Sequence, residues 1–417
     1  MVFEGIMTEK YLAQKNILLG VTGSIAVYKA ADLASKLAQA GALVDVILTP
    51  AATEFITPLT YQSVTGRIAY TDKDLWGAQA HVLHVGLGHT ADMFVVAPAT
   101  ANTIAKLAHG IADNLLVLSG LSFGPGTPDR PLLIAPAMDG GMFNHPSTLE
   151  NLEVLRQRGA IIIGPEEGHL ASGLEARGRM TEPSVLLAHI RYLLTRQGPL
   201  KGRQVVVTAG GTQEPIDPVR MIANHSSGKQ GYALAQTALD EGAQVTLIST
   251  PVSLLPPQGA TYIQVTSAAE MESAVLHASR SCDVLLMAAA VADFRPTESA
   301  SQKIKKQSGV PTIELEPTSD ILSIVSKRRA RSKQPKVLIG FAAETQDLLT
   351  NAAVKLKLKH LDLIVANDVS KSTSGFGADT NQVTLLFPDG HSEPLPLLAK
   401  SEVADRVIFE VVKLLSK

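Results

Sequence analysis

Two stretches of the chain share one order of features: an apolar run, a glycine-containing turn and the start of a helical pattern. They occupy residues 17–30 and residues 204–231. Glycines let a ligand approach the backbone closely, and the free N–H groups at a helix start attract anions. Because the two stretches lie in opposite halves of the chain, they predict two nucleotide-type domains.

Length and composition are those expected of two globular domains. A chain of 417 residues, 45% hydrophobic and 18% charged, is long enough for two well-buried cores. The net charge of −2 gives no basic field for nucleic acid or an anionic membrane. No apolar run is as long as a membrane span and no signal peptide is evident, so we expect a cytoplasmic protein. The single cysteine, Cys282, cannot form an internal disulfide and is expected to be a small buried hydrophobic residue.

The first half alternates short β-rich runs with helical patterns. The runs predicted as strands are 17–19, 44–48, 93–97 and 132–135. This alternation predicts an α/β fold with a doubly wound parallel sheet, whose ligands bind beyond the carboxyl ends of the strands. Small, hydroxyl and amide residues at those ends suit a phosphate and a flat heteroaromatic ring. No loop combines GxGxxG with a following acidic residue, which disfavours a nicotinamide dinucleotide.

A breaker-rich connector, RQGPLKG, spans residues 196–202. We therefore predict a first domain at 15–197 and a second at 198–417, each with a Rossmann-like three-layer fold. Residues 1–14 have little periodicity and are expected to be a frayed extension.

Three motifs of the first half resemble the homo-oligomeric flavin-containing cysteine decarboxylases. They are GVTGSIA at 20–26, APATANT at 97–103 and PAMDGGM at 136–142. The resemblance implies a Rossmann-like trimer with FMN at the subunit interface. It also implies that His84, followed by Ala91 and Asp92 in the family's spacing, is the catalytic histidine. The implied FMN-binding residues are Gly23, Ser24, Thr49, Thr100, Ala101, Asn102, Thr103 and Ala137.

Two further positions of the implied catalytic pocket depart from that family. Asp139 stands where the family has an asparagine that contacts the substrate carboxylate, and Ser172 stands where it has a cysteine. An ionised aspartate would repel a carboxylate, so we expect Asp139 to be held partly neutral or paired. A serine hydroxyl is a much weaker acid than a thiol. The two changes therefore either compensate for each other or leave this half inactive.

Six collinear stretches of the second half resemble the phosphopantothenate–cysteine ligases. They are DPVR at 217–220, NHSSGK at 224–229, AAAVAD at 288–293, KIKK at 303–306, GFAAET at 340–345 and ANDV at 366–369. With both halves in this order, the chain is similar to the bacterial bifunctional proteins of coenzyme A biosynthesis, from about residue 15 onward.

The ligase resemblance implies a reaction in which CTP with Mg²⁺ activates the carboxylate of 4′-phosphopantothenate as an acyl-cytidylate. L-cysteine then displaces CMP. Lys303 would neutralise the charge that develops in the first step, and Asn224 would orient the intermediate. Lys355 and Lys359 have the spacing of one helix face and should repel each other unless an anion lies between them. The implied nucleotide-binding residues are Ser226, Ser227, Gly228, Lys229, Ala289, Ala290, Asp293, Lys303, Asp320, Ile321, Phe341, Lys355 and Lys359.

The resemblance as a whole implies ligation followed by FMN-dependent decarboxylation to 4′-phosphopantetheine. It also implies a homo-oligomer with trimeric decarboxylase halves and dimeric ligase halves, which together could build a dodecamer. One alternative is an active ligase whose flavoprotein half serves only as a scaffold. Another is a sugar-nucleotide or dinucleotide oxidoreductase, which is disfavoured because neither glycine turn is followed by a ribose-binding acidic residue.

Overall fold

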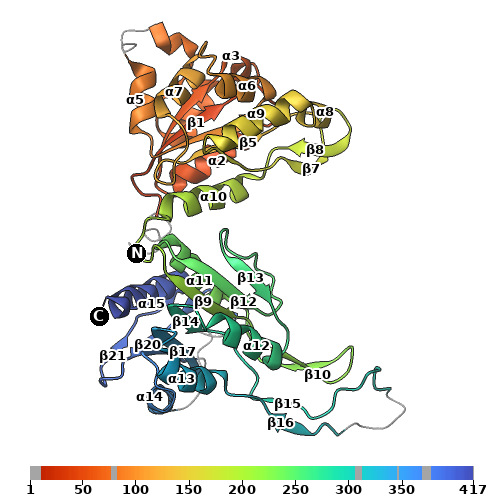
Figure 1. Ribbon diagram of the computed structural model, residues 1–417, viewed down its shortest axis with the longest axis vertical. Helices are drawn as coiled ribbons and strands as arrows, with labels where there is room; N and C mark the ends of the chain where they lie inside the picture. Colours follow the sequence, from red (N-terminus) through yellow and green to blue (C-terminus); the bar gives the residue numbers. More distant parts are fainter. Residues whose placement is uncertain (1–10, 77–81, 306–311, 345–346, 369–376, 417) are drawn as a thin grey trace. The chain divides into compact units, whose positions relative to one another are not determined.

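The computed structural model describes residues 11–76, 82–305, 312–344, 347–368 and 377–416. It divides into two compact units, Met1–Thr195 and Arg196–Lys417, and the predicted boundary lies within a few residues of this division (Figure 1). Both units are built on mostly parallel sheets flanked by helices, so the predicted α/β fold class is confirmed.

The first unit contains a six-stranded parallel sheet with strand order β3-β2-β1-β4-β5-β6. The order reverses between β1 and β4, so the connections that leave these two strands run in opposite directions. Each of the four predicted strand runs lies inside an observed strand. The strands are β1 (Asn16–Val21), β2 (Leu43–Leu48), β3 (Ala69–Tyr70), β4 (Met93–Ala99), β5 (Leu132–Pro136) and β6 (Ile161–Ile162).

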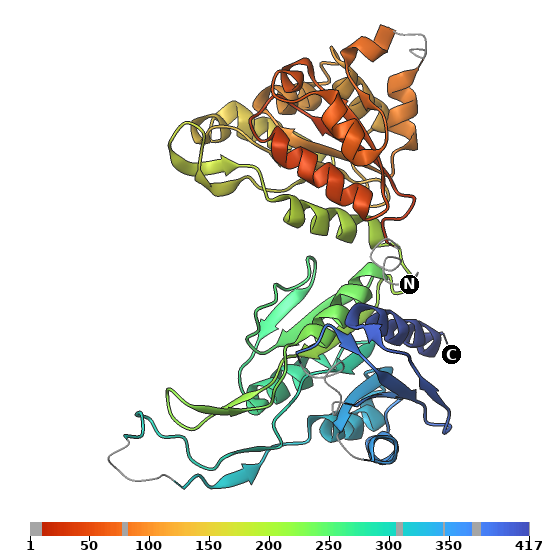
Figure 2. The ribbon, with the colours of Figure 1, turned by 180° about the vertical axis from the view of Figure 1, so that it is seen from behind.

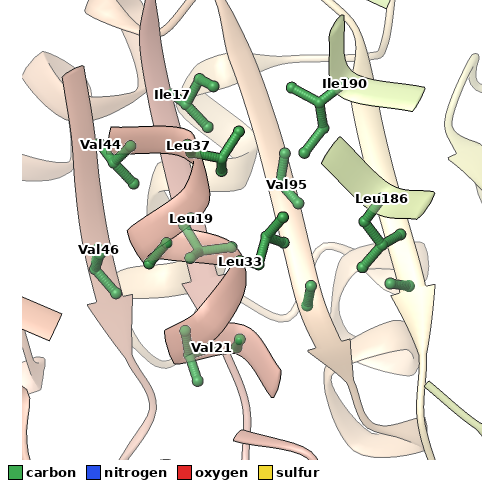
Figure 3. Close-up of a cluster of buried hydrophobic side chains, with 14 of the residues drawn as sticks. Ile17, Leu19, Val21, Leu33, Leu37, Val44, Val46, Val95, Leu186 and Ile190 are labelled. Carbon is green, nitrogen blue, oxygen red and sulfur yellow. The ribbon is translucent and has the colours of Figure 1, made fainter. Parts of the chain in front are cut away.

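The two faces of this sheet are covered by different helices. Ile17, Leu19 and Val21 alternate along β1 and point to one face, where they meet Leu33 of α2 and Ile190 of α10 (Figure 3). The opposite face packs against α6, α7 and α9. The helices of this unit are α2 (Val27–Gln39), α3 (Pro50–Thr53), α4 (Pro58–Thr65), η1 (Asp72–Trp76), α5 (Leu83–Thr90), α6 (Ala101–His109), α7 (Leu115–Phe123), α8 (Gly140–Phe143), α9 (Pro146–Gln157) and α10 (Pro183–Thr195).

The folded part of the first unit begins earlier than predicted. Leu12, in the stretch predicted to be frayed, is only 2% exposed and belongs to the same hydrophobic core as α2. A single leucine carries no periodicity, so the sequence pattern could not reveal its burial. Residues 1–10 lie outside the described part of the chain.

The second unit is organised around an eight-stranded sheet with order β13-β12-β9-β14-β17-β18-β20-β21. The strands from β13 to β18 are parallel, and β20 and β21 are added antiparallel. The order reverses between β9 and β14, as it does between β1 and β4. The strands of the sheet are β9 (Gln204–Ala209), β12 (Gln244–Ser249), β13 (Thr261–Gln264), β14 (Val284–Met287), β17 (Val337–Glu344), β18 (Leu363–Asp368), β20 (Val383–Leu386) and β21 (Ser392–Pro394).

Helices cover both faces of this sheet as well. One face packs against α12 (Ala268–Ala278), α13 (Ile321–Ser332) and α14 (Leu348–Leu358). The other carries α11 (Lys229–Asp240), which packs against α15 (Lys400–Leu415). Gly231 allows α11 to approach β9 closely, since a Cβ at this position would lie 2.6 Å from the Cβ of Ala209.

Small antiparallel pairs lie outside the main sheet. The pairs β10 (Gln213–Pro215) with β11 (Met221–Ala223) and β15 (Phe294–Pro296) with β16 (Leu315–Pro317) extend away from it (Figures 1 and 2). The pair β19 (Thr380–Asn381) with β22 (Leu398–Ala399) leads into α15. In the first unit, β7 (Glu166–His169) and β8 (Glu175–Arg179) form the hairpin that contains Ser172. Among the helices that the structure describes, none is long and apolar enough to cross a membrane.

The cysteine of the second unit is buried, as predicted. Cys282 is 1% exposed within the core beneath α12 and α13, and burial raises the pKa of its thiol to about 12. We predict that a disulfide reagent at about pH 8 does not modify the folded protein, because only the thiolate reacts. One thiol per chain should react once denaturant is added.

Glutathione measured in parallel shows that the reagent is active. Modification of the native protein at the glutathione rate would contradict the buried position of Cys282.

Candidate active sites

A threonine bridge closes the carboxyl edge of the first sheet where the strand order reverses. The Thr22 hydroxyl, which follows β1, donates to the carbonyl of Pro98 at 2.7 Å and accepts from the N–H of Thr100 at 3.0 Å. Thr22 is buried. The bridge therefore fixes the loop after β1 against the end of β4.

The predicted FMN-binding residues follow the strands of this edge. Gly23 packs on α3 so closely that a Cβ there would lie 2.5 Å from that of Ala51. Thr49 is the N-cap of α3 and accepts from Ala52 N at 3.3 Å, so its hydroxyl has a structural partner. Ala137 follows β5 and donates its N–H to the carbonyl of Ala99 at 3.0 Å. Ser24 lies beside Gly23 in the loop after β1.

Helix α6 directs its N-terminus to the same edge. Thr100 is its N-cap, and Ala101, Asn102 and Thr103 form its first turn. N–H groups of a first turn have no partner inside their own helix, and the helix dipole adds positive potential there. Small side chains next to a helix N-terminus fit the phosphate and the flat ring of a flavin nucleotide.

His84 lies in the first turn of α5, a helix that packs against α7. Its Nδ1 is buried and, among the described residues, has no hydrogen-bond partner. His84 does not line the cavity that contains Asp139 and Ser172. The structure therefore places the predicted catalytic residues of this unit in two groups.

That cavity, of about 340 Å³, lies between the loop after β1, the loop after β5 and the β7–β8 hairpin. Ser172 Oγ donates to Asp139 Oδ2 at 2.7 Å, so the two departures from the family pattern are paired with each other. Asp139 also caps α8 by accepting from Gly141 N at 2.9 Å. The Ser172 hydroxyl and then the Gly141 N–H lower the pKa of the Asp139 carboxyl. The expectation that Asp139 is partly neutral or paired is met through pairing, and both contacts stabilise the charged form of the carboxyl.

The same cavity contains a lysine that the sequence reasoning missed. Lys29 is buried on α2, and its Nζ donates to the carbonyl of Met180 at 3.0 Å and to Glu182 Oε1 at 2.9 Å. It thereby ties α2 to the chain that leaves the β7–β8 hairpin. A lysine on the apolar face of an amphipathic helix is the signal that could have revealed it.

The second unit contains a cavity of about 660 Å³ at the carboxyl ends of β9, β14 and β17. Asn224 and every predicted nucleotide-binding residue except Lys303 line it. Lys303 is exposed, in the connection between β15 and β16. The adjoining Ile304 is held by Asp217 and Arg220, through bonds of 3.2 and 2.6 Å. Three residues of the predicted motifs, Lys306, Thr345 and Val369, lie outside the described residues.

Threonine hydroxyls also shape the edge of this sheet. Thr208 Oγ1 accepts from Ala289 N at 3.1 Å, and Thr212 Oγ1 accepts from Ala292 N at 2.9 Å. Both bonds cross from the β9 side to the loop after β14. Asn224 Nδ2 donates to the carbonyl of Val291 in this loop, at 3.2 Å, so the amide of Asn224 is oriented before any ligand binds.

Two cations of the cavity already have carboxylate partners. Lys359 is the C-cap of α14, and its Nζ lies 3.0 Å from the carboxylate of Asp320, which in turn caps α13. Lys229 Nζ lies 2.6 Å from Asp379. The expected repulsion between Lys355 and Lys359 is thus offset at Lys359 by a carboxylate of the chain itself.

The cavity also includes residues that no motif indicated. Gln230, Asn381 and Lys400 line it, although Lys400 is far from the glycine turn in sequence. A lysine in the first turn of a helix is unfavourable because of the helix dipole, and that anomaly is the available signal.

Comparisons with known proteins agree with the two units. Residues 6–195 match a family described as Flavoprotein, and residues 200–415 match the DNA/pantothenate metabolism flavoprotein C-terminal domain. The coenzyme A biosynthesis bifunctional protein CoaBC of Bacillus subtilis is 47% identical over 406 residues, which cover 97% of this chain and 98% of that protein. The protein of the same name from Vibrio cholerae is 44% identical, over 95% of this chain and 98% of its own length.

A solved structure of the C-terminal domain of a CoaBC protein is 41% identical and covers 52% of this chain and 98% of that chain, with a TM-score of 0.45. The curated relatives match the chain through both of its units and over nearly their whole length. The chain therefore belongs to the family of bifunctional coenzyme A biosynthesis proteins.

Proposed function

We propose that the chain ligates L-cysteine to 4′-phosphopantothenate with CTP and then decarboxylates the product to 4′-phosphopantetheine. These are two consecutive reactions of coenzyme A biosynthesis. The observation that carries the proposal is the cavity of the second unit, which gathers the predicted nucleotide-binding residues and Asn224 in a chain of this family. The first unit supplies the decarboxylase with its own, separate cavity.

In the ligase step, a carboxylate oxygen of 4′-phosphopantothenate attacks the α-phosphorus of CTP and pyrophosphate leaves. The amine of cysteine then attacks the acyl carbon, loses a proton and displaces CMP. Lys229, Lys355 and Lys359 supply positive charge along the cavity, and the N-terminus of α11 adds its dipole. The amide of Asn224, held against Val291, orients the acyl-cytidylate. Lys303 does not line the cavity of its own chain, so its charge-neutralising role stays a prediction.

In the decarboxylase step, bound FMN would supply the capacity to accept two electrons and to return them. The loop after β1, the first turn of α6, Thr49 and Ala137 would hold the FMN, with the N–H groups of the α6 first turn available to its phosphate. His84 would accept the proton and return it. The hydrogen bond from the Ser172 hydroxyl to Asp139 fixes the positions of both side chains in the cavity.

The subunits form an oligomer through the flavoprotein half and the ligase half. Ile25 and Tyr28, which are 60% and 62% exposed, present apolar surface directly after the predicted FMN-binding residues Gly23 and Ser24. Apolar surface beside a ligand site supports an interface between subunits there, and we infer that this interface builds trimers with FMN between subunits. Dimers of the ligase half would then link trimers.

Decarboxylation should depend on His84. We predict that the parent protein, given 4′-phosphopantothenate, cysteine, CTP and Mg²⁺, forms 4′-phosphopantetheine. The His84→Asn variant should retain FMN and stop at the ligated, still carboxylated product, because the amide cannot transfer a proton near neutral pH. Mass spectrometry of the products separates the two outcomes, and ATP in place of CTP at equal concentration tests the choice of nucleotide.

The control is His89→Asn, which changes an exposed histidine on the same helix. CO₂ release by the His84→Asn variant at the parent rate would remove His84 from the reaction. A parent that ligates but never releases CO₂ would establish the scaffold alternative for the flavoprotein half.

The charge of Asp139 should remain constant through the neutral range. Because Ser172 and Gly141 lower the pKa of the Asp139 carboxyl, this group stays ionised when the pH falls to the usual pKa of an aspartate. We predict that Asp139→Asn keeps the α8 cap, retains CO₂ release and leaves the shape of its pH profile unchanged between about pH 5 and pH 8.

Asp129→Asn, at an exposed position of the same unit, serves as the matched variant. An ionisation within that pH range in the parent that disappears only in Asp139→Asn would show that the carboxyl titrates during the reaction. Loss of CO₂ release in Asp139→Asn alone would make Asp139 an obligatory acid–base group.

Magnesium should enter the ligase cavity together with the nucleotide. The described residues contain no group of three or more His, Cys, Asp or Glu side chains able to hold a metal ion. Mg²⁺ prefers a few carboxylate ligands combined with substrate phosphates. We predict that calorimetry detects Mg²⁺ binding to the protein only with CTP present, and that chelation stops ligation until Mg²⁺ is restored. Stoichiometric Mg²⁺ binding to the protein alone would contradict this.

A further inference from the structure

Helices α11 and α15 run parallel and begin side by side. Gln230, in the first turn of α11, donates through Nε2 to the carbonyl of Lys400 at 3.0 Å. Further along both helices, the Thr237 hydroxyl donates to Asp405 at 2.9 Å. One bond joins the first turns of the two helices, and the other joins residues further toward their C-termini. The N-termini of both helices, where the helix dipoles are positive, therefore lie side by side. Gln230 and Lys400 both line the ligase cavity there.

Lys400 places a further positive charge at this paired helix start. It occupies the first turn of α15 and is 8% exposed. Its backbone N–H donates to the backbone carbonyl of Asp379, and its own carbonyl accepts from Gln230. Within the described part of the chain, its ammonium has no hydrogen bond or ion pair. Burial and then the charge of Lys229 lower the pKa of Lys400.

The chain itself offers little to offset this charge. Asp379 attracts Lys400, but its side chain is 88% exposed and it already pairs with Lys229 at 2.6 Å. A buried cation beside a second cation and two helix N-termini is unfavourable without an anion. An anionic ligand bound here would offset the free-energy cost of burying the Lys400 ammonium.

Neighbouring amides hold Lys400 in this position. Asn381 Nδ2 donates to Gln230 Oε1 at 2.8 Å, and Gln230 in turn binds the Lys400 carbonyl. This chain of bonds joins β19, α11 and α15, three elements that are distant in sequence. The placement of Lys400 therefore depends on specific polar contacts as well as on the packing of the two helices.

We propose that Lys400 is an anion-binding residue of the ligase cavity and contacts a phosphate group held at the joined N-termini of α11 and α15. The inference rests on the proposed ligase function for the identity of the ligand. Two ligands of that reaction carry suitable phosphates: the polyphosphate of the nucleotide and the phosphate ester of 4′-phosphopantothenate. Both present the same chemistry to a lysine ammonium.

The test compares full-length parent, Lys400→Gln, Lys400→Arg and Lys357→Gln proteins by calorimetry with CTP, CMP, inorganic pyrophosphate and 4′-phosphopantothenate. Lys357→Gln removes an exposed charge of the same unit that does not line the cavity. We expect Lys400→Gln to weaken binding of CTP and pyrophosphate by about tenfold or more, with CMP unchanged, since a charge-assisted hydrogen bond is lost. Lys400→Arg should recover most of the affinity, and Lys357→Gln should match the parent.

The pattern of losses identifies the source of the phosphate. Weaker binding of 4′-phosphopantothenate with intact CTP binding also supports an anion site and assigns it to that substrate. Parent-like binding of all four ligands to Lys400→Gln overturns the inference. If neither substrate binds the parent, the proposed function fails, while pyrophosphate binding that depends on Lys400 still supports the anion site.

Thermal unfolding separates a role in binding from a role in folding. Removing an unpaired buried charge should leave the melting temperature of the unliganded protein unchanged or raise it. A clear fall in melting temperature, together with weak binding that Lys400→Arg does not recover, would make Lys400 a structural residue and overturn the proposal.

Discussion

Both sheets depend on hydroxyl groups at the point where the order of their strands reverses. Thr22 crosses from β1 to the end of β4, and Thr208 and Thr212 cross from the β9 side to the loop after β14. Connections leave the two central strands in opposite directions, so backbone N–H and C=O groups there lose their sheet partners. Buried threonines satisfy these groups and fix the loops that border the two candidate sites.

The fold and much of each site could be predicted because their determinants are local. The glycine turn after β9 and the start of α11 at Lys229 are both visible in the local sequence, and Asn224 and Lys229 line the cavity. Contacts between distant segments left no such pattern. Lys359 meets Asp320 across two helix ends, and Lys400 joins the cavity through Gln230. Pairings of this kind depend on how helices pack, and periodicity does not encode them.

The position of Lys303 illustrates another limit. Its motif is collinear with the other ligase motifs, yet the residue lies outside the cavity that they build. Asp217 and Arg220 hold the adjoining backbone near the β10–β11 pair. A sequence motif shows which residues occur together along the chain. The position of Lys303 in space depends instead on contacts of the adjoining backbone with residues near the β10–β11 pair. Asp139 shows the converse: a substitution that looks unfavourable alone acquires a partner in Ser172.

The burial of the single cysteine thiol has a consequence for an enzyme whose substrate and product carry thiols. The only cysteine is in a core, and the exposed tip of the β7–β8 hairpin carries the hydroxyl of Ser172. Thiol–disulfide exchange requires an accessible thiolate on one partner and a disulfide on the other. The protein therefore offers no ready site for a mixed disulfide with oxidised cysteine or with an oxidised product, and oxidants that convert surface thiols to sulfenic acids find no target beside Asp139.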